Sequence, residues 1–88
     1  MGKYEIVFKR SVYKDLKAIS KADVARILKR IDALADDPRC SGCEKLSGQE
    51  RYRVRQGVYR IIYEIEDDRL MITVVKIGHR GSVYSLRK

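Results

Sequence analysis

The sequence has 88 residues, 44% of them apolar and 36% charged, with a formal net charge of +8 and a pI near 9.7. This length suits one domain with a small core, and the composition is too apolar for a disordered chain. The length excludes a multi-cofactor enzyme, and no apolar run approaches the roughly 18 residues of a transmembrane helix. Residues 1–10 carry charges and no apolar stretch of signal-peptide length, so we expect a soluble cytoplasmic protein with one domain over 1–88.

The first half of the chain has one strand pattern followed by two helix patterns. Alternating apolar residues over 3–9 predict a first strand, and Ser11 is the expected cap of a short helix. Ser20 and Asp23 fit a capping box that opens a second helix, which Pro38 ends. The apolar stripes have helical spacing and comprise Val12, Leu16 and Ile19 in the first helix and Val24, Ile27, Leu28, Ile31, Leu34 and Ala35 in the second.

The two cysteines, Cys40 and Cys43, form one CxxC motif directly after the second helix. A structural zinc site needs about four ligands, and the single histidine, His79, is the only other soft ligand. A redox CxxC begins a helix after a strand, whereas this motif follows a helix in a predicted loop. We therefore expect two reduced thiols, with neither a metal site nor a redox centre.

Strand periodicity fills most of the second half. Gln56-Gly57 and Asp67-Asp68 are predicted two-residue turns between three strands over 51–55, 58–66 and 69–77. The element order β-α-α-β-β-β predicts an α+β fold: a mainly antiparallel four-stranded sheet with the two N-terminal helices packed on one face.

A two-residue loop determines the register of a hairpin. The first predicted turn places Arg53 opposite Arg60, and the second places Tyr63 opposite Ile72. Both registers then put one apolar set on the same face, which supports both turns. The predicted core set is Tyr52, Val54, Tyr59, Ile61, Tyr63, Ile65, Leu70, Ile72 and Val74.

The opposite face collects basic side chains, because 51–63 contains arginines and no acid. Like charges directly opposite each other destabilise a hairpin by up to about 1 kcal/mol, so selection for stability alone disfavours them. Guanidinium forks bind phosphate oxygens bidentately, which makes this face a candidate site for a polyanion. The alternative is a solvated basic face with splayed side chains. The arginines concerned are Arg51, Arg53, Arg55 and Arg60.

Three further chemical groups follow the last predicted strand within 78–84, namely His79, Arg80 and Tyr84. Tyr84 is a candidate to stack on a nucleobase beside the arginines. The alternatives are a structural or exposed histidine and a tyrosine that serves packing.

These motifs as a set resemble the RelE/ParE superfamily of toxins, and specifically the RelE-like ribosome-dependent mRNA interferases. The resemblance covers nearly the whole chain and is strongest over 52–64 and 75–84, with further matches at 4–8, 37–38 and 45–48. It implies the toxin of a type II toxin–antitoxin system, with mRNA bound in the ribosomal A site on the exposed face of the sheet. The ribose 2′-OH would attack the adjacent phosphate, with no metal or organic cofactor. The implied partners are a cognate antitoxin and ribosome-bound mRNA, with operator DNA reached only through the antitoxin complex and no membrane.

The resemblance also implies residue roles. Arg53 and Arg55 match the basic pair of the family's second strand, and Arg60 matches an arginine of its third. Arg80 matches the C-terminal arginine and Tyr84 the late tyrosine. The basic pair is lysine in the prototype, and an arginine is effectively always protonated, so this pair stabilises charge but accepts protons poorly.

The identity of the general base that takes the 2′-OH proton is therefore open. His79 is the candidate, because the surrounding guanidinium groups disfavour a second positive charge and so favour a neutral imidazole. The alternative is cleavage by positioning and electrostatics alone, with mRNA ordered by the ribosome. Additional expected RNA contacts are Arg51, Lys76 and Arg87.

Two other functions fit the same fold: a ParE-like inhibitor of DNA gyrase, and a non-catalytic module that acts in an antitoxin-bound repressor. The arginine set with Tyr84 favours the nuclease, because a gyrase inhibitor has no evident need for it.

Overall fold

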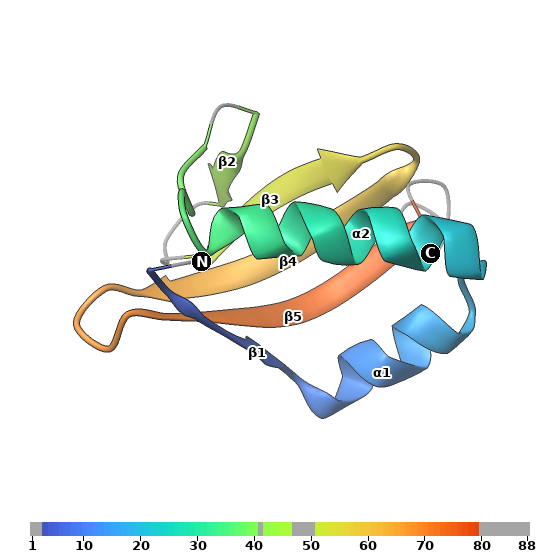
Figure 1. Ribbon diagram of the computed structural model, residues 1–88, viewed down its shortest axis with the longest axis horizontal. Coiled ribbons are helices and arrows are strands. Elements are labelled where there is room, and N and C mark those ends of the chain that lie inside the picture. The colour runs from blue at the N-terminus through green and yellow to red at the C-terminus, as the bar shows by residue number, and fades with distance from the viewer. Residues whose placement is uncertain (1–2, 41, 47–50, 80–88) are drawn as a thin grey trace.

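The computed structural model describes residues 3–40, 42–46 and 51–79, and within them the chain forms seven helices and strands (Figure 1). The predicted α+β fold and its order are confirmed, with one strand more than expected. The elements are β1 (Glu5–Phe8), α1 (Arg10–Lys17), α2 (Lys21–Leu34), β2 (Glu44–Leu46), β3 (Arg51–Gln56), β4 (Tyr59–Glu66) and β5 (Met71–His79). None of these helices is long and apolar enough to cross a membrane.

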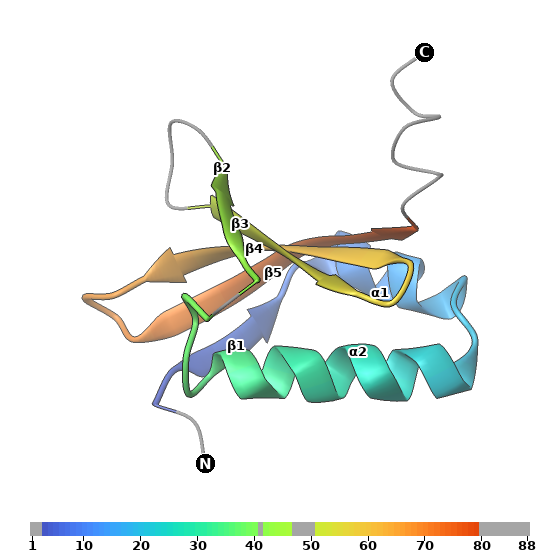
Figure 2. The ribbon, with the colours of Figure 1, turned by 90° about the horizontal axis from the view of Figure 1, so that it is seen from above.

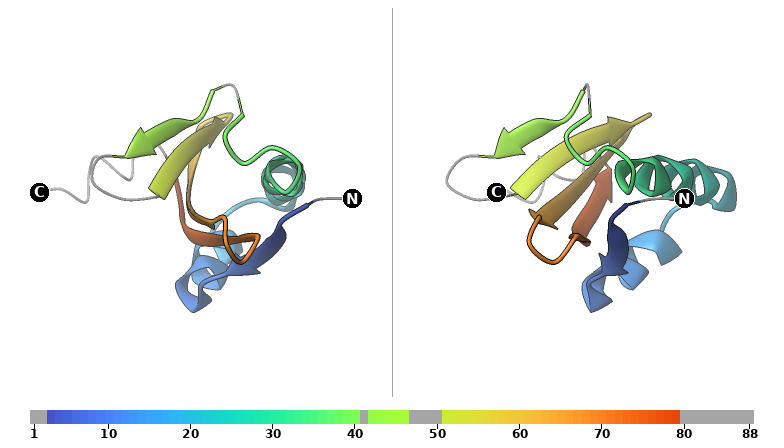
Figure 3. Two further views of the ribbon diagram at one scale, coloured as in Figure 1. Left: turned by 90° about the vertical axis from the view of Figure 1, so that its left-hand side faces the viewer. Right: turned by 60° about the vertical axis from the view of Figure 1, so that its left-hand side comes forward.

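The strands form a single sheet in the order β1-β5-β4-β3-β2, with β1 and β2 at its two edges (Figure 3). β1 runs parallel to β5, and the other pairs are antiparallel. The strand β2 is not predicted from the sequence. Its three residues are too few to show the alternation that identifies a strand, and only pairing with β3 defines it.

One face of the sheet carries the core, and α2 lies along it (Figure 2). The predicted cap of α2 is confirmed, because the Ser20 side chain accepts a hydrogen bond from the Asp23 backbone N–H at 3.3 Å. The prediction that Ser11 caps α1 is wrong: α1 begins at Arg10, after Lys9, without a side-chain cap. The buried cluster is Val12, Ile27, Ile31, Leu34, Tyr52, Val54, Ile61, Tyr63, Ile65, Ile72, Val74 and Ile77.

The predicted register of the β3–β4 hairpin is wrong. Arg55, and not Arg53, is the partner of Arg60, and Gln56 pairs with Tyr59. The connection is therefore Gly57-Val58, with Gly57 at φ +62°. A glycine with positive φ at the first loop position matches the strand twist in a two-residue turn, which accounts for the shift.

The predicted β4–β5 register is also wrong, because the loop has four residues, Asp67–Leu70, and Glu66 pairs with Met71. Leu70 has φ +49° and a 45% exposed side chain, so it lies outside the core that was expected to contain it. Tyr59 is only partly buried. The β3–β4 register differs from prediction by two residues along the partner strand, and so does the β4–β5 register between the loop and Tyr63. A shift of two preserves the face of each side chain, so the predicted apolar face is otherwise correct.

A bulge interrupts β5. Ile62 pairs with Lys76 while Tyr63 pairs with Val74, which leaves Val75 as an extra residue. The bulge reverses the alternation beyond it and turns Ile77 into the core, where its side chain is 2% exposed.

Candidate nucleic-acid interface

The sheet face opposite α2 carries the arginines. Arg51, Arg53 and Arg55 occupy alternate positions of β3, and alternate residues of a strand share a face. Arg60 joins them from β4 as the direct partner of Arg55. The structure therefore brings the four arginines predicted from sequence together on one face, and the close like-charge pair is Arg55 with Arg60.

Burial separates the members of this pair. Arg60 is the buried charged residue of the described chain, with 6% of its surface exposed, while Arg55 is exposed. A guanidinium does not lose its proton in proteins, so the Arg60 charge lies within the sheet surface rather than in solvent. Reduced solvent screening strengthens its attraction for an anion bound on that face.

Two predicted RNA contacts already have carboxylate partners. Arg51 donates to Glu64 Oε2 from Nε at 3.1 Å and from Nη2 at 2.5 Å, across the β3–β4 ladder. Lys76 Nζ lies 3.2 Å from Asp15 Oδ1 of α1. These pairings lower the net positive charge that the face offers to a polyanion.

Glu44 is the site residue that sequence reasoning missed. It opens β2 as the register partner of Arg53, and its carboxylate forms an ion pair with the Arg53 guanidinium. The hydrogen bond and charge of Arg53, followed by the charges of Arg55 and Arg60, lower the pKa of Glu44. The charges of three guanidinium groups thus favour the ionised form of this carboxyl. The sequence carries no signal for this, because β2 itself is not apparent.

His79 lies on the other face. Its register partner is Tyr59, and the two rings meet edge to face with centroids 5.5 Å apart. Arg60 pairs with Gly78, the preceding residue, and successive residues of a strand point to opposite faces. The structure therefore does not bring His79 together with the arginines. Three other candidates, Arg80, Tyr84 and Arg87, lie outside the described residues.

Cys40 and Cys43 are free and partly buried. Burial raises the pKa of the Cys40 thiol, and the Arg30 guanidinium, 3.9 Å from its sulfur, only partly opposes this. A thiol with a raised pKa is a weak nucleophile at neutral pH. Within 3–40, 42–46 and 51–79, no group of three or more His, Cys, Asp or Glu side chains is placed to hold a metal ion.

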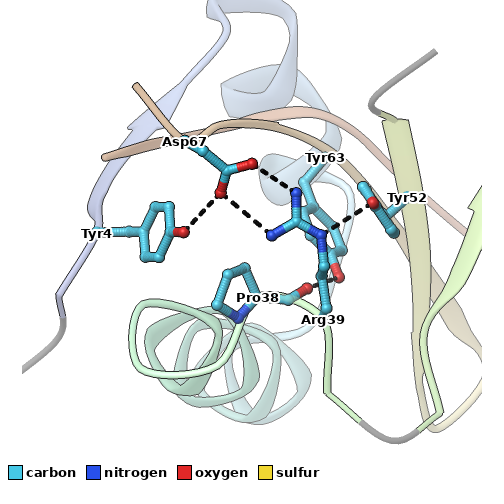
Figure 4. A network of polar contacts seen from close by, with 6 residues as sticks. All are labelled: Tyr4, Pro38, Arg39, Tyr52, Tyr63 and Asp67. Carbon is cyan, nitrogen blue, oxygen red and sulfur yellow. Dashed lines mark hydrogen bonds and ion pairs between the residues drawn. The ribbon is translucent and has the colours of Figure 1, made fainter. Parts of the chain in front are cut away.

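A polar cluster at the far end of β4 joins four segments of the chain (Figure 4). Tyr4 Oη donates to Asp67 Oδ1 at 2.7 Å, and Arg39 Nη2 contacts Asp67 Oδ2 at 2.8 Å. Arg39 Nε also donates to Tyr52 Oη at 3.1 Å. Arg39 and then Tyr4 lower the pKa of Asp67 through these hydrogen bonds. Since Asp67 follows β4 while Arg60 lies near its start, the cluster is structural and separate from the arginines.

A groove of about 630 Å³ runs between α1 and α2 on the molecular surface. Its lining includes Leu16, Val24, Tyr13 and Leu28. Tyr13 is 55% exposed and Leu28 is 40% exposed. Lys17 and Lys21 lie on the same groove. An apolar groove with basic residues fits an amphipathic helix with acidic flanks.

Comparison with known proteins gives one consistent result. The model of the family described as "ParE toxin of type II toxin-antitoxin system, parDE" matches residues 6–84. A putative RelE-like toxin protein of Escherichia coli is 25% identical over 88 residues, covering 96% of this chain and 93% of that protein.

Solved structures agree. The RelE–RelB complex of Pyrococcus horikoshii OT3 contains a similar chain, with a TM-score of 0.79 and 30% identity over 90% of this chain and 97% of that one. The RelB–RelE antitoxin–toxin complex of Methanococcus jannaschii matches with a TM-score of 0.76 and 27% identity over 93% of this chain and 99% of that one.

Proposed function

The chain belongs to the ParE toxin family of type II toxin–antitoxin systems, within the RelE/ParE superfamily. We propose that within this superfamily it acts as a ribosome-dependent mRNA endoribonuclease. The observation that carries the proposal is the placement of Arg53, Arg55 and Arg60 on one face of the sheet, with Arg60 directly opposite Arg55. A transferring phosphate develops negative charge on its oxygens, and preorganised guanidinium groups stabilise that charge.

In the proposed reaction, the ribose 2′-hydroxyl gives up its proton as its oxygen bonds to the adjacent phosphorus, and the bond from that phosphorus to the 5′-oxygen breaks. The departing 5′-oxygen takes up a proton, so the products are a cyclic phosphate and a free 5′-OH with no net change in protons. Arg55 is exposed and contacts a phosphate from solvent, while Arg60 supports it from the sheet. His79 faces away from the arginines. This favours cleavage by positioning and electrostatics over a mechanism in which His79 is the general base. A ribosomal substrate places the protein in the cytoplasm.

The proposed partner is a cognate antitoxin. The similar chains in the Pyrococcus and Methanococcus structures are each in complex with RelB. The groove between α1 and α2 offers an apolar surface with Lys17 and Lys21 nearby, which suits an acidic amphipathic helix. With a net charge of +8, association is expected to slow as salt is raised. An association rate independent of salt would contradict the electrostatic part of this proposal.

The decisive experiment is primer extension on mRNA held in programmed ribosomes, with the purified protein added. We expect cleavage within the A-site codon, and none on the same mRNA without ribosomes. The Arg55→Ala variant is the matched negative control, since Arg55 is exposed and its loss leaves the core intact.

The alternative with an observation in its favour is gyrase inhibition, because the matching family model is that of ParE toxins. A supercoiling assay with DNA gyrase separates the two. Inhibition of gyrase without cleavage on ribosomes would replace the proposal. A chain that does neither, yet binds an antitoxin and operator DNA together, would be the non-catalytic repressor module.

A further inference from the structure

The ion pair between Glu44 and Arg53 places an acid inside the arginine face. We infer that the Glu44 carboxylate is an internal counter-anion, which occupies Arg53 in the free protein and yields this position to a phosphodiester when single-stranded nucleic acid binds. The inference rests on the proposed function for the identity of the face, and it deepens that function by assigning Glu44 a place in the binding step.

Position supports the exchange. A carboxylate and a phosphate present similar oxygens to a guanidinium, so they compete for the same fork. Glu44 is joined to Arg53 from the neighbouring strand and is also affected by the charges of Arg55 and Arg60. A phosphate bound to Arg53 would therefore take the place that the carboxylate already occupies.

The exposure of the Glu44 side chain allows its carboxylate to move away from Arg53. The Glu44 side chain is 60% exposed, whereas the Arg53 side chain is 24% exposed. β2 is a strand of three residues at the edge of the sheet that the described residues form, where it pairs with β3. Exposed ion pairs contribute little to stability, so a multiply charged ligand can displace this one while Arg53 stays in place.

A second ion pair on the same face provides a contrast. Arg51 donates two hydrogen bonds to Glu64 Oε2, and the two residues are cross-strand partners on β3 and β4, which are both inner strands of the sheet. Their side chains are 39% and 33% exposed. Glu64 thus belongs to the inner strand β4 and neutralises Arg51, whereas Glu44 belongs to the edge strand β2.

The test measures binding without cleavage. The probe is a short single-stranded oligoribonucleotide with 2′-O-methyl groups, which cannot be cleaved because it has no attacking hydroxyl. Fluorescence anisotropy at constant low salt gives the Kd for the wild type and for Glu44→Gln. The matched control is Glu5→Gln, which removes the same charge from β1, the opposite edge strand, where Glu5 is also exposed.

We expect Glu44→Gln to bind the probe about fivefold more tightly than the wild type, and Glu5→Gln to differ by less than about twofold. In an Arg53→Ala background, the gain from Glu44→Gln should disappear, because the carboxylate then has no guanidinium to release. Weaker binding by Glu44→Gln would show instead that Glu44 orients Arg53, and would overturn the exchange. Equal gains from both glutamine variants would reduce it to a net-charge effect and also overturn it.

The two proposals fail in different ways. If the wild type binds the probe no better than Arg53→Ala, the exchange falls, whereas the nuclease is decided by cleavage on ribosomes. If binding depends on Arg53 but Glu44→Gln gains nothing over Glu5→Gln, only the exchange falls. If the wild type does not cleave mRNA on ribosomes although Glu44→Gln binds the probe more tightly, only the proposed nuclease function is overturned.

Discussion

Asp15 Oδ2 accepts a hydrogen bond from the backbone N–H of Ile77 at 3.2 Å, which joins α1 to β5 at the point where β1 no longer pairs with β5. β1 ends at Phe8 opposite Val74, and among the described residues no strand pairs with this edge of β5 beyond Val74. The carboxylate takes the role that a strand would otherwise have, and its other oxygen contacts Lys76 Nζ. A helix side chain thereby caps the sheet edge just beyond the bulge.

Replacement of Asp15 should therefore destabilise the fold. Asp15→Ala leaves the Ile77 N–H without its acceptor and Lys76 without its counter-charge, and we expect a loss of about 1–3 kcal/mol in the free energy of unfolding. Urea denaturation followed by circular dichroism measures this. Asp15→Asn, which keeps an acceptor oxygen, should lose less, and Asp68→Ala on the exposed β4–β5 loop is the control. Equal stability of Asp15→Ala and the wild type would contradict the capping role.

Arg55→Ala should abolish cleavage without harm to the fold. Arg55 is exposed and lies opposite Arg60, so its removal relieves a like-charge pair that costs up to about 1 kcal/mol. We expect an unchanged or slightly raised unfolding midpoint and a loss of about 10²-fold or more in single-turnover cleavage on ribosomes. Arg26→Ala, an exposed arginine of α2, controls for net charge. A lowered midpoint in Arg55→Ala would indicate a structural arginine. Arg60 is less suitable for this test, because it is buried.

His79→Ala should retain cleavage. His79 packs against Tyr59 on the face opposite Arg60, so we expect its removal to change the single-turnover rate by less than about threefold. The pH dependence of the cleavage rate between pH 5.5 and 9 should keep its shape, because no proton is transferred to His79. If the variant instead loses about 10²-fold and its profile changes, His79 is the base and reaches the RNA by a rearrangement of this end of β5.

Acid should weaken the cluster around Asp67. Arg39 and Tyr4 hold the pKa of Asp67 below its usual range in the folded protein. Such a group adds stability above its unfolded pKa of about 3.9, and this contribution is lost as pH falls through the folded value. We therefore expect the wild type to have a higher Tm than Asp67→Asn at pH 7, with the difference shrinking below about pH 4. Asp68→Asn should show no such convergence. A difference that stays constant down to pH 3 would mean that the carboxylate charge is not what stabilises the cluster.

Local patterns determined the elements and the faces of this protein. The alternation in β3 and β4 assigns each residue to one side of the sheet, and this assignment survives a register error of two because the side-chain period is also two. The cap at Ser20 depends only on residues within one helical turn, so it too could be predicted. The four arginines were placed on one face for the same reason.

Only the tertiary structure decided which of these side chains meet. The pairing of Arg55 with Arg60 depends on the conformation of Gly57, and the direction of His79 depends on the bulge at Val75 and on pairing with Tyr59. Glu44 enters the site through a strand of three residues that exists because β3 offers it an edge. Residue types along the chain therefore determined the chemistry of the face, whereas contacts between distant segments decided its partners, since loop geometry and edge pairing are not encoded in any local period.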